Sequence, residues 1–180
     1  MPQLRILHVT PYFSDAWAYG GIPRVAGTLA RGLARRGHSV TVCTTDARDE
    51  ASRLPAGETR TPDGVTVHVF PNFSNRLAYH LQLFLPLGFS KFLERHAASF
   101  DVAHVHACRN MPGVIAAHHL RRARVPYVLA PNGTAPRIER RLMAKRIFDV
   151  IEGQRVLRGA ARVMAVSEAE RRGAFTSAFF

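Results

Sequence analysis

Three short segments of the sequence carry the groups with which it could bind a polar ligand. In the first, residues 19–23, Gly20 and Gly21 directly precede an expected helix. Backbone N–H groups and the positive end of the helix dipole can approach an anion there, because no side chain intervenes. The segment could therefore hold a phosphate, although Gly-Gly is also a common turn before a helix. The glycine spacing is not that of the dinucleotide fingerprint.

A pair of histidines forms the second candidate. His104 and His106 lie two residues apart in an expected strand, so their imidazoles point to the same face. Two histidines are an incomplete metal site, and no acidic or cysteine partner stands at a suitable spacing, so the sequence requires no metal. A buried, hydrogen-bonded histidine is an equal alternative at His104, whereas His106, nearest the strand end, is the better candidate for ligand contact. His118 and His119 lie within a helical pattern and are interpreted as structural or solvated.

The third candidate is the turn at residues 130–136, which follows another expected strand. Asn132, the Gly133 backbone and Thr134 all offer groups that can bind a polar ligand. Asn-Gly is equally a common turn dipeptide. Spacing alone gives the ligand site and the simple turn equal weight.

The net charge of +12 indicates attraction to polyanions. Residues 121–162 contain 11 basic and 3 acidic residues, so this stretch alone carries +8. Arg137, Arg141 and Lys145 recur at helical i, i+4 spacing and could contact a phosphorylated ligand or an anionic lipid surface, or could be solvated. Residues 77–92 are apolar enough to dip into a membrane interface, but core packing explains them equally well. No nucleic-acid-binding module is recognisable, so nucleic acid is not an expected partner.

Composition bounds the class and location of the protein. The 180 residues, 47% of them hydrophobic, suffice for one globular domain. Neither a signal peptide nor a membrane span is expected, and Cys43 and Cys108 lack metal-ligand spacing, which favours a reducing compartment. We therefore expect a cytoplasmic protein, with peripheral contact at the inner face of the cytoplasmic membrane as a further option. Arginine supplies 23 of the 25 basic residues, which is typical of a GC-rich bacterial genome.

The elements that would position the three segments alternate between strands and helices, which predicts a parallel sheet with crossover helices. Strands are expected at residues 4–10, 39–44, 65–70, 101–106, 125–130 and 161–166, and helices from Pro23 onward and at residues 76–98, 114–122 and 138–157. The second of these helices should break near Pro86 and Gly88. Residues 46–63 are expected to be an exposed loop.

The first helix is expected to turn Val25, Leu29 and Leu33 toward the sheet and to end at Gly37. The overall prediction is an α/β fold, a Rossmann-like doubly wound parallel sheet spanning residues 1–166. Residues 167–180 should begin a further helix, because Ser167 and Glu170 have the spacing of a capping box. In such a sheet ligands bind at the carboxyl ends of the strands, where all three candidate segments are expected.

The order of these segments resembles the N-terminal domain of family 4 glycosyltransferases, the retaining GT-B group. The resemblance is carried, in order along the chain, by residues 7–11 (LHVTP), 20–24 (GGIPR), 29–42, 101–106 (DVAHVH), 131–133 (PNG) and 165–170 (AVSEAE). Each motif is weak when taken alone. Their order and spacing over nearly the whole chain carry the resemblance.

The resemblance implies two Rossmann-like domains facing a cleft, of which this chain is the acceptor-side half and the C-terminal donor-binding domain is absent. It places Gly20 and Gly21 near the donor phosphates and the acceptor, with His106 as the catalytic residue near the reacting sugar. It also assigns substrate binding to Arg24, Asn132, Gly133 and Thr134. Histidine often precedes the glycine of the PNG motif in this family. An asparagine there can position a ligand but cannot act as a base.

The implied activity is transfer of a sugar, in the manner of a hexosyltransferase, from a nucleoside diphosphate sugar to a hydroxyl of a carbohydrate or lipid-linked acceptor, with retention at the anomeric carbon. The nucleotide sugar would be a co-substrate, and no cofactor or metal is expected. The chain alone should be inactive, because most donor contacts would come from the second domain. The alternative is a non-catalytic binding module that docks on a partner chain.

Overall fold

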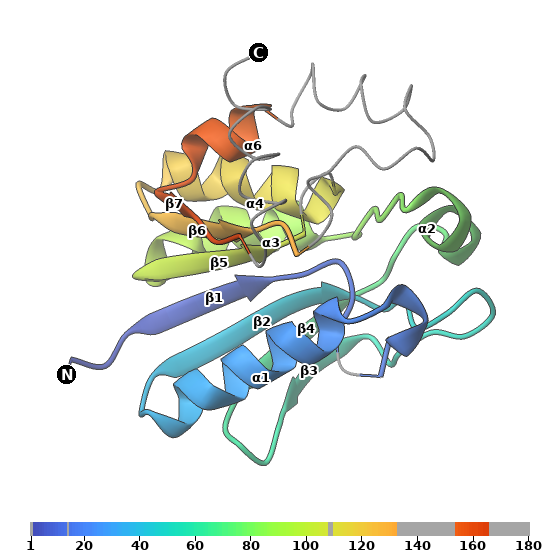
Figure 1. Ribbon diagram of the computed structural model, residues 1–180, viewed down its shortest axis with the longest axis horizontal. Coiled ribbons are helices and arrows are strands. Elements are labelled where there is room, and N and C mark those ends of the chain that lie inside the picture. Colours follow the sequence, from blue (N-terminus) through green and yellow to red (C-terminus); the bar gives the residue numbers. More distant parts are fainter. Residues whose placement is uncertain (1, 14, 108–109, 133–153, 166–180) are drawn as a thin grey trace.

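A computed structural model describes residues 2–13, 15–107, 110–132 and 154–165. Its strands form one sheet in the order β3-β4-β2-β1-β5-β6-β7, shown in Figure 1. The strands are β1 (Arg5–Val9), β2 (Ser39–Thr45), β3 (Gly57–Arg60), β4 (Thr66–Phe70), β5 (Val102–His106), β6 (Tyr127–Ala130) and β7 (Arg162–Val163). All neighbours pair in parallel except β3, which is antiparallel to β4. The predicted Rossmann-like α/β fold is confirmed.

Helices cover both faces of this sheet. The described helices are α1 (Ile22–Arg35), α2 (Asn75–Leu81), α3 (Phe89–His96), α4 (Met111–Arg122) and α6 (Gln154–Gly159), with short 3-10 turns at Trp17–Tyr19 and Ala97–Ser99. Figure 1 shows α1 on one face, α3, α4 and α6 together on the other, and α2 beyond the strand ends. No helix in the described ranges is long and apolar enough to cross a membrane.

The central strand β1 contributes to both layers of the core, because successive side chains of a strand point to opposite faces. Leu7 and Val9 pack into the apolar cluster that includes α3 and α4. His8 points to the opposite face, in register with Val42, which packs against α1. A polar imidazole therefore lies on the α1 face of the sheet centre.

The face that α1 turns toward the sheet differs from the prediction. Val25 is 40% exposed and Leu29 and Leu33 are only partly buried, so the predicted inner face is wrong at Val25. The buried residues are mostly small: Ile22, Pro23, Ala26, Gly27 and Ala30. Such small residues let a helix lie close to a sheet. The prediction placed the larger apolar side chains on the inner face and therefore missed this one. The helix ends as predicted, with Gly37 at a φ of +88°.

Three further elements differ from their predicted bounds. Residues 46–63 contain β3, an edge strand that the pattern missed because all its side chains are exposed. The predicted 76–98 helix is confirmed as two helices, with a left-handed Gln82 (φ +56°) ending α2. Helix α4 begins at Met111, earlier than expected. The predicted 138–157 helix lies largely outside the described residues, although α6 overlaps its end, and the helix expected from Ser167 lies entirely outside them.

Candidate functional site

The strand order changes direction between β1 and β5. Strand β1 leads through α1 to β2 on one side, whereas β5 leads through α4 to β6 on the other, and the two helices cover opposite faces. The loops after β1 and β5 therefore part from each other at the carboxyl edge of the sheet. Ligands of open α/β sheets bind at such a switch point. The first two candidate segments lie on these two loops or at their strand ends.

The glycine segment leaves the start of α1 open. Gly20 and Gly21 are both exposed, and a Cβ atom built on either meets nothing within 4 Å. Gly20 needs its glycine for a φ of +93°, but Gly21 has an ordinary φ of −83° as the N-cap residue and makes no side-chain cap. The turn explanation therefore accounts for Gly20, and at Gly21 glycine is one of the residues favoured at a helix N-cap. Exposed Arg24 lies beside this entrance, its Cζ 5.6 Å from the centre of the Trp17 ring.

Three histidines meet at the carboxyl ends of β1 and β5. His8 Nδ1 lies 3.0 Å from His106 Nε2, and the rings of His104 and His106 stack with centres 4.1 Å apart. His8 was missed by the sequence analysis, although its strand was predicted. The signal that could have identified His8 is the register of the two strands, because their parallel pairing sets His8 directly opposite His104.

Burial keeps these three imidazoles neutral at pH 7. The exposed fractions are 0% for His8 and His106 and 9% for His104. Burial lowers the pKa of His8 to about 3, of His104 to about 4 and of His106 to about 2, and nearby histidines lower those of His8 and His106 further. Each ring therefore has one donor and one acceptor nitrogen.

Both ring nitrogens of His106 are occupied within the protein. Its Nδ1 lies 3.4 Å from Asn132 Nδ2, and its Nε2 contacts His8. Asn132 is only partly buried and adopts a left-handed φ of +53° just after β6. Asn132 is thus the more exposed residue of this hydrogen-bonded pair. The buried His106 ring fixes the position of the Asn132 amide.

Asn110 fixes the loop after β5. Its Nδ2 donates to the Ala107 carbonyl at 3.1 Å, and its Oδ1 accepts the Gly113 N–H at 2.7 Å. The same side chain thereby holds the left-handed Ala107 (φ +64°) and caps α4. The analysis missed this residue, but an Asn two positions before Pro112 is a recognisable start of a helix.

An apolar cluster brings the loops at this edge together. Tyr12 and Tyr19 stack with ring centres 4.9 Å apart, and Phe84 packs edge-on against both. The same cluster includes Ile22 at the start of α1 and Ala107 after β5. The glycine segment and the end of β5 are thus parts of one packed rim.

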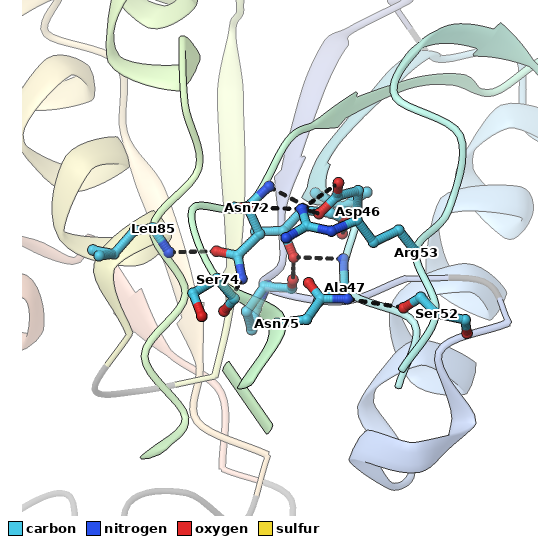
Figure 2. A network of polar contacts seen from close by, with 11 residues as sticks. Asp46, Ala47, Ser52, Arg53, Asn72, Ser74, Asn75 and Leu85 are labelled. Atoms are coloured by element: carbon cyan, nitrogen blue, oxygen red, sulfur yellow. Dashed lines mark hydrogen bonds and ion pairs between the residues drawn. The ribbon is translucent and has the colours of Figure 1, made fainter. Parts of the chain in front are cut away.

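A network around the buried carboxylate of Asp46 reaches the segment that contains Leu85 (Figure 2). Asp46, 4% exposed just after β2, accepts two hydrogen bonds from Arg53 Nη1, at 3.1 and 2.9 Å, and one from the Asn72 N–H at 2.8 Å. Arg53 also donates to the Asn72 carbonyl at 2.7 Å, and Asn72 Oδ1 accepts the Leu85 N–H at 2.7 Å. This network joins the ends of β2 and β4 to residues 82–88. Nothing in the sequence analysis indicated it.

The remaining candidate residues lie apart from this edge or outside the described ranges. Gly133, Thr134 and the basic strip at 137–145 belong to the undescribed part of the chain. Buried Cys43 is a free thiol, and burial raises its pKa. A hollow of about 520 Å³ lies among α3, α4 and α6, and its lining includes His118 and His119.

Comparison with known proteins found a matching family model and several solved structures of similar fold. The sequence model of the glycosyl transferase 4-like domain matches residues 20–178. A solved structure described as "Trehalose-6-phosphate from E. coli bound with UDP-2-fluoro glucose" is similar in fold, with a TM-score of 0.50 and 14% identity. The match covers 96% of this chain but 42% of that structure's chain, so this chain spans less than half its length. No curated protein sequence matches.

Replacing Asp46 should destabilise the rim. In Asp46→Asn the buried site loses the carboxylate that accepts from Arg53 and the Asn72 backbone, and we expect the free energy of unfolding to fall by about 1–3 kcal/mol. Urea denaturation measures the change. The control is Asp63→Asn, which breaks the exposed pair with Arg35 and should cost under about 1 kcal/mol. Equal losses in the two variants would contradict the assigned role.

The buried histidines should make stability fall with acidity. The unfolded chain takes up protons near pH 6.5, whereas the folded histidines resist them until about pH 4 or lower, so acid favours unfolding across this window. Each histidine should remove roughly 1 kcal/mol per pH unit below 6.5. Urea titrations at pH 7.5, 6 and 5 in metal-free buffer measure the slope. His104→Gln should make the slope shallower, and an unchanged slope in this variant would refute the assignment.

Proposed function

The chain belongs to the glycosyl transferase 4-like domain family, and from this premise we propose that it is the acceptor-side domain of a nucleotide-sugar-dependent hexosyltransferase. The reaction is transfer of a sugar from a nucleoside diphosphate sugar to an acceptor hydroxyl, with retention at the anomeric carbon. The observation that carries the proposal is the open start of α1 at the switch point of the sheet.

The start of α1 suits the charge that develops in this reaction. The bond from the anomeric carbon to the diphosphate breaks, so negative charge grows on the departing phosphate oxygens. The Gly20 N–H already donates to the Trp17 carbonyl at 3.1 Å. The exposed backbone of Gly21 and the positive end of a 14-residue helix can stabilise that charge, and Arg24 lies one turn away. No covalent or metal step is required of these groups.

We assign Asn132 to contact with the reacting sugar and His106 to the positioning of Asn132. The Asn132 amide can both donate to and accept from a sugar hydroxyl. His106 is a positioning residue in this arrangement, because it is fully buried and its Nδ1 faces the Asn132 amide. Its low pKa, about 2, is unsuited to proton transfer at pH 7. Gly133 and Thr134 complete the proposed substrate-binding set from outside the described residues.

The exposed apolar side chains around α2 favour an acceptor with a lipid part. Phe73, Leu81 and Leu87, at either end of α2 and in the segment that follows it, are each more than half exposed. Such side chains beside a polar site suit a carbohydrate carried on a lipid, with peripheral contact at the inner face of a bacterial cytoplasmic membrane. The protein is accordingly proposed to act in the cytoplasm.

Substitution of Gly21 separates a phosphate-binding role from a simple turn. A Cβ at Gly21 meets no atom within 4 Å other than those of its chain neighbours, and its φ is ordinary. Gly21→Val should therefore lower the melting temperature only modestly, through loss of a favoured N-cap residue. A valine there would obstruct a phosphate, and we expect UDP-glucose to bind at least tenfold more weakly, as measured by NMR titration. Gly32→Val, in open space within α1, is the control. Unaltered UDP-glucose binding by Gly21→Val would reject the phosphate cradle.

The 180-residue chain alone should show little or no transfer. The similar structure is more than twice as long as the matched region, and we propose that a second domain supplies most donor contacts. The test incubates the purified chain with UDP-glucose and simple glycoside acceptors and measures labelled product by chromatography. Robust transfer would contradict this proposal. Acceptor binding that never leads to turnover, even in a chain extended by a second domain, would favour a non-catalytic binding module.

A further inference from the structure

We propose that His8, His104 and His106 form a binding site for a divalent transition-metal ion of the zinc class. One ring nitrogen from each residue lies within 4.8 Å of the other two, and all three side chains are buried. Within the described ranges, no other group of three His, Cys, Asp or Glu side chains lies this close together. The proposal does not depend on sugar transfer, because it needs only these three side chains.

The sheet holds the three rings on one face. His104 and His106 are two residues apart on β5, and His8 pairs with His104 across the parallel β1–β5 ladder. The centre of the His8 ring lies 5.2 Å from that of the His104 ring and 5.3 Å from that of the His106 ring. Both strands are central in the sheet, so the rings project from a rigid support, which is what a metal site needs.

Two of the buried nitrogens lack a partner that the protein could provide. His8 Nε2 and His104 Nε2 are shielded from solvent and have no hydrogen-bond partner. Such orphaned atoms are rare in native proteins and require an explanation. Coordination of an ion supplies one for His104 Nε2, and for His8 Nε2 if that nitrogen, rather than Nδ1, is the ligand.

The contacts around His106 fit a ligand role. Metal-binding histidines commonly donate their second ring N–H to a neighbouring acceptor, which fixes the ring. His106 Nε2 faces His8, and a metal bound there leaves the proton on Nδ1. The Asn132 amide, whose Nδ2 lies 3.4 Å from Nδ1, would then turn to present its Oδ1 as the acceptor. With His8 Nδ1 as the ligand, binding would replace that imidazole contact with two metal–nitrogen bonds of about 2.0–2.1 Å, and the two nitrogens would move from 3.0 Å to about 3.3 Å apart in a tetrahedral site. In that case His104 Nε2 is the orphaned nitrogen that coordination explains.

The donor set selects the class of metal. Three neutral imidazoles suit zinc, cobalt, nickel or copper, whereas magnesium and calcium prefer oxygen ligands. Three histidines are also the protein ligands of one known type of zinc site, in which water takes the fourth position. The site would join β1 to β5 just below the loops of the proposed sugar site.

The test is metal binding by the tag-free chain after removal of metals with EDTA. We expect one equivalent of Co²⁺ to give the visible absorption of tetrahedral cobalt, Zn²⁺ to displace it, and the melting temperature to rise by several degrees with Zn²⁺. Paramagnetic Co²⁺ should broaden the NMR signals of His8, His104 and His106 before those of other histidines. Mg²⁺ at the same concentration should do none of these.

Variants decide whether the three histidines are the ligands. His104→Gln and His8→Asn should each bind Co²⁺ at least tenfold more weakly, whereas the control His118→Gln, on the exposed side of α4, should bind as the unmodified chain does. Circular dichroism checks that each variant is folded. If a variant fails to fold, the broadening pattern in the unmodified chain decides. Absence of stoichiometric Co²⁺ binding, or broadening centred on other histidines, would overturn the proposal.

Discussion

The parallel pairing of β1 with β5 is the constraint on which the rest of the structure depends. Strand β1 lies between β2 and β5, so the two halves of the sheet join along this one ladder. The crossovers turn opposite ways from it, which places α1 and α4 on opposite faces and separates their loops. The same ladder sets His8 opposite His104. One pairing thus defines both the opening between these loops and the position of the histidine cluster.

The loops at this opening are held by polar contacts at their bases and by aromatic packing between them. Asn110 fixes the end of β5 and the start of α4, and Asp46 with Arg53 fixes the ends of β2 and β4. Tyr12 and Tyr19 pack with Phe84 to join the segments. Because Asp46 and Asn110 are buried and hydrogen-bonded, and Tyr12 and Phe84 are buried, the exposed backbone of Gly21 is presented from a rigid rim, as preorganised electrostatic stabilisation requires.

Most of the sheet could be predicted from the sequence, because its strands are short, β-branched segments separated by helical patterns. The edge strand β3 could not, since its four residues are all exposed and show no alternation. The exposed glycines at the start of α1 could be predicted, because a local motif marks them. The partners of the candidate site that lie far apart in the sequence could not, as for His8 and His106, 98 residues apart, and Asp46 and Asn72, 26 residues apart. Such pairs follow from strand order, which residue patterns do not specify.

The measurement that tests the central claim most directly is an NMR titration of the ¹⁵N-labelled chain with UDP-glucose, which detects binding even at millimolar Kd. Sugar-nucleotide recognition at the switch point predicts the largest amide shifts at residues 19–24, with further shifts at residues 106–113 and at Asn132. Shifts confined to the hollow among α3, α4 and α6, around His118 and His119, would contradict the account, because that surface lies apart from the carboxyl ends of β1 and β5.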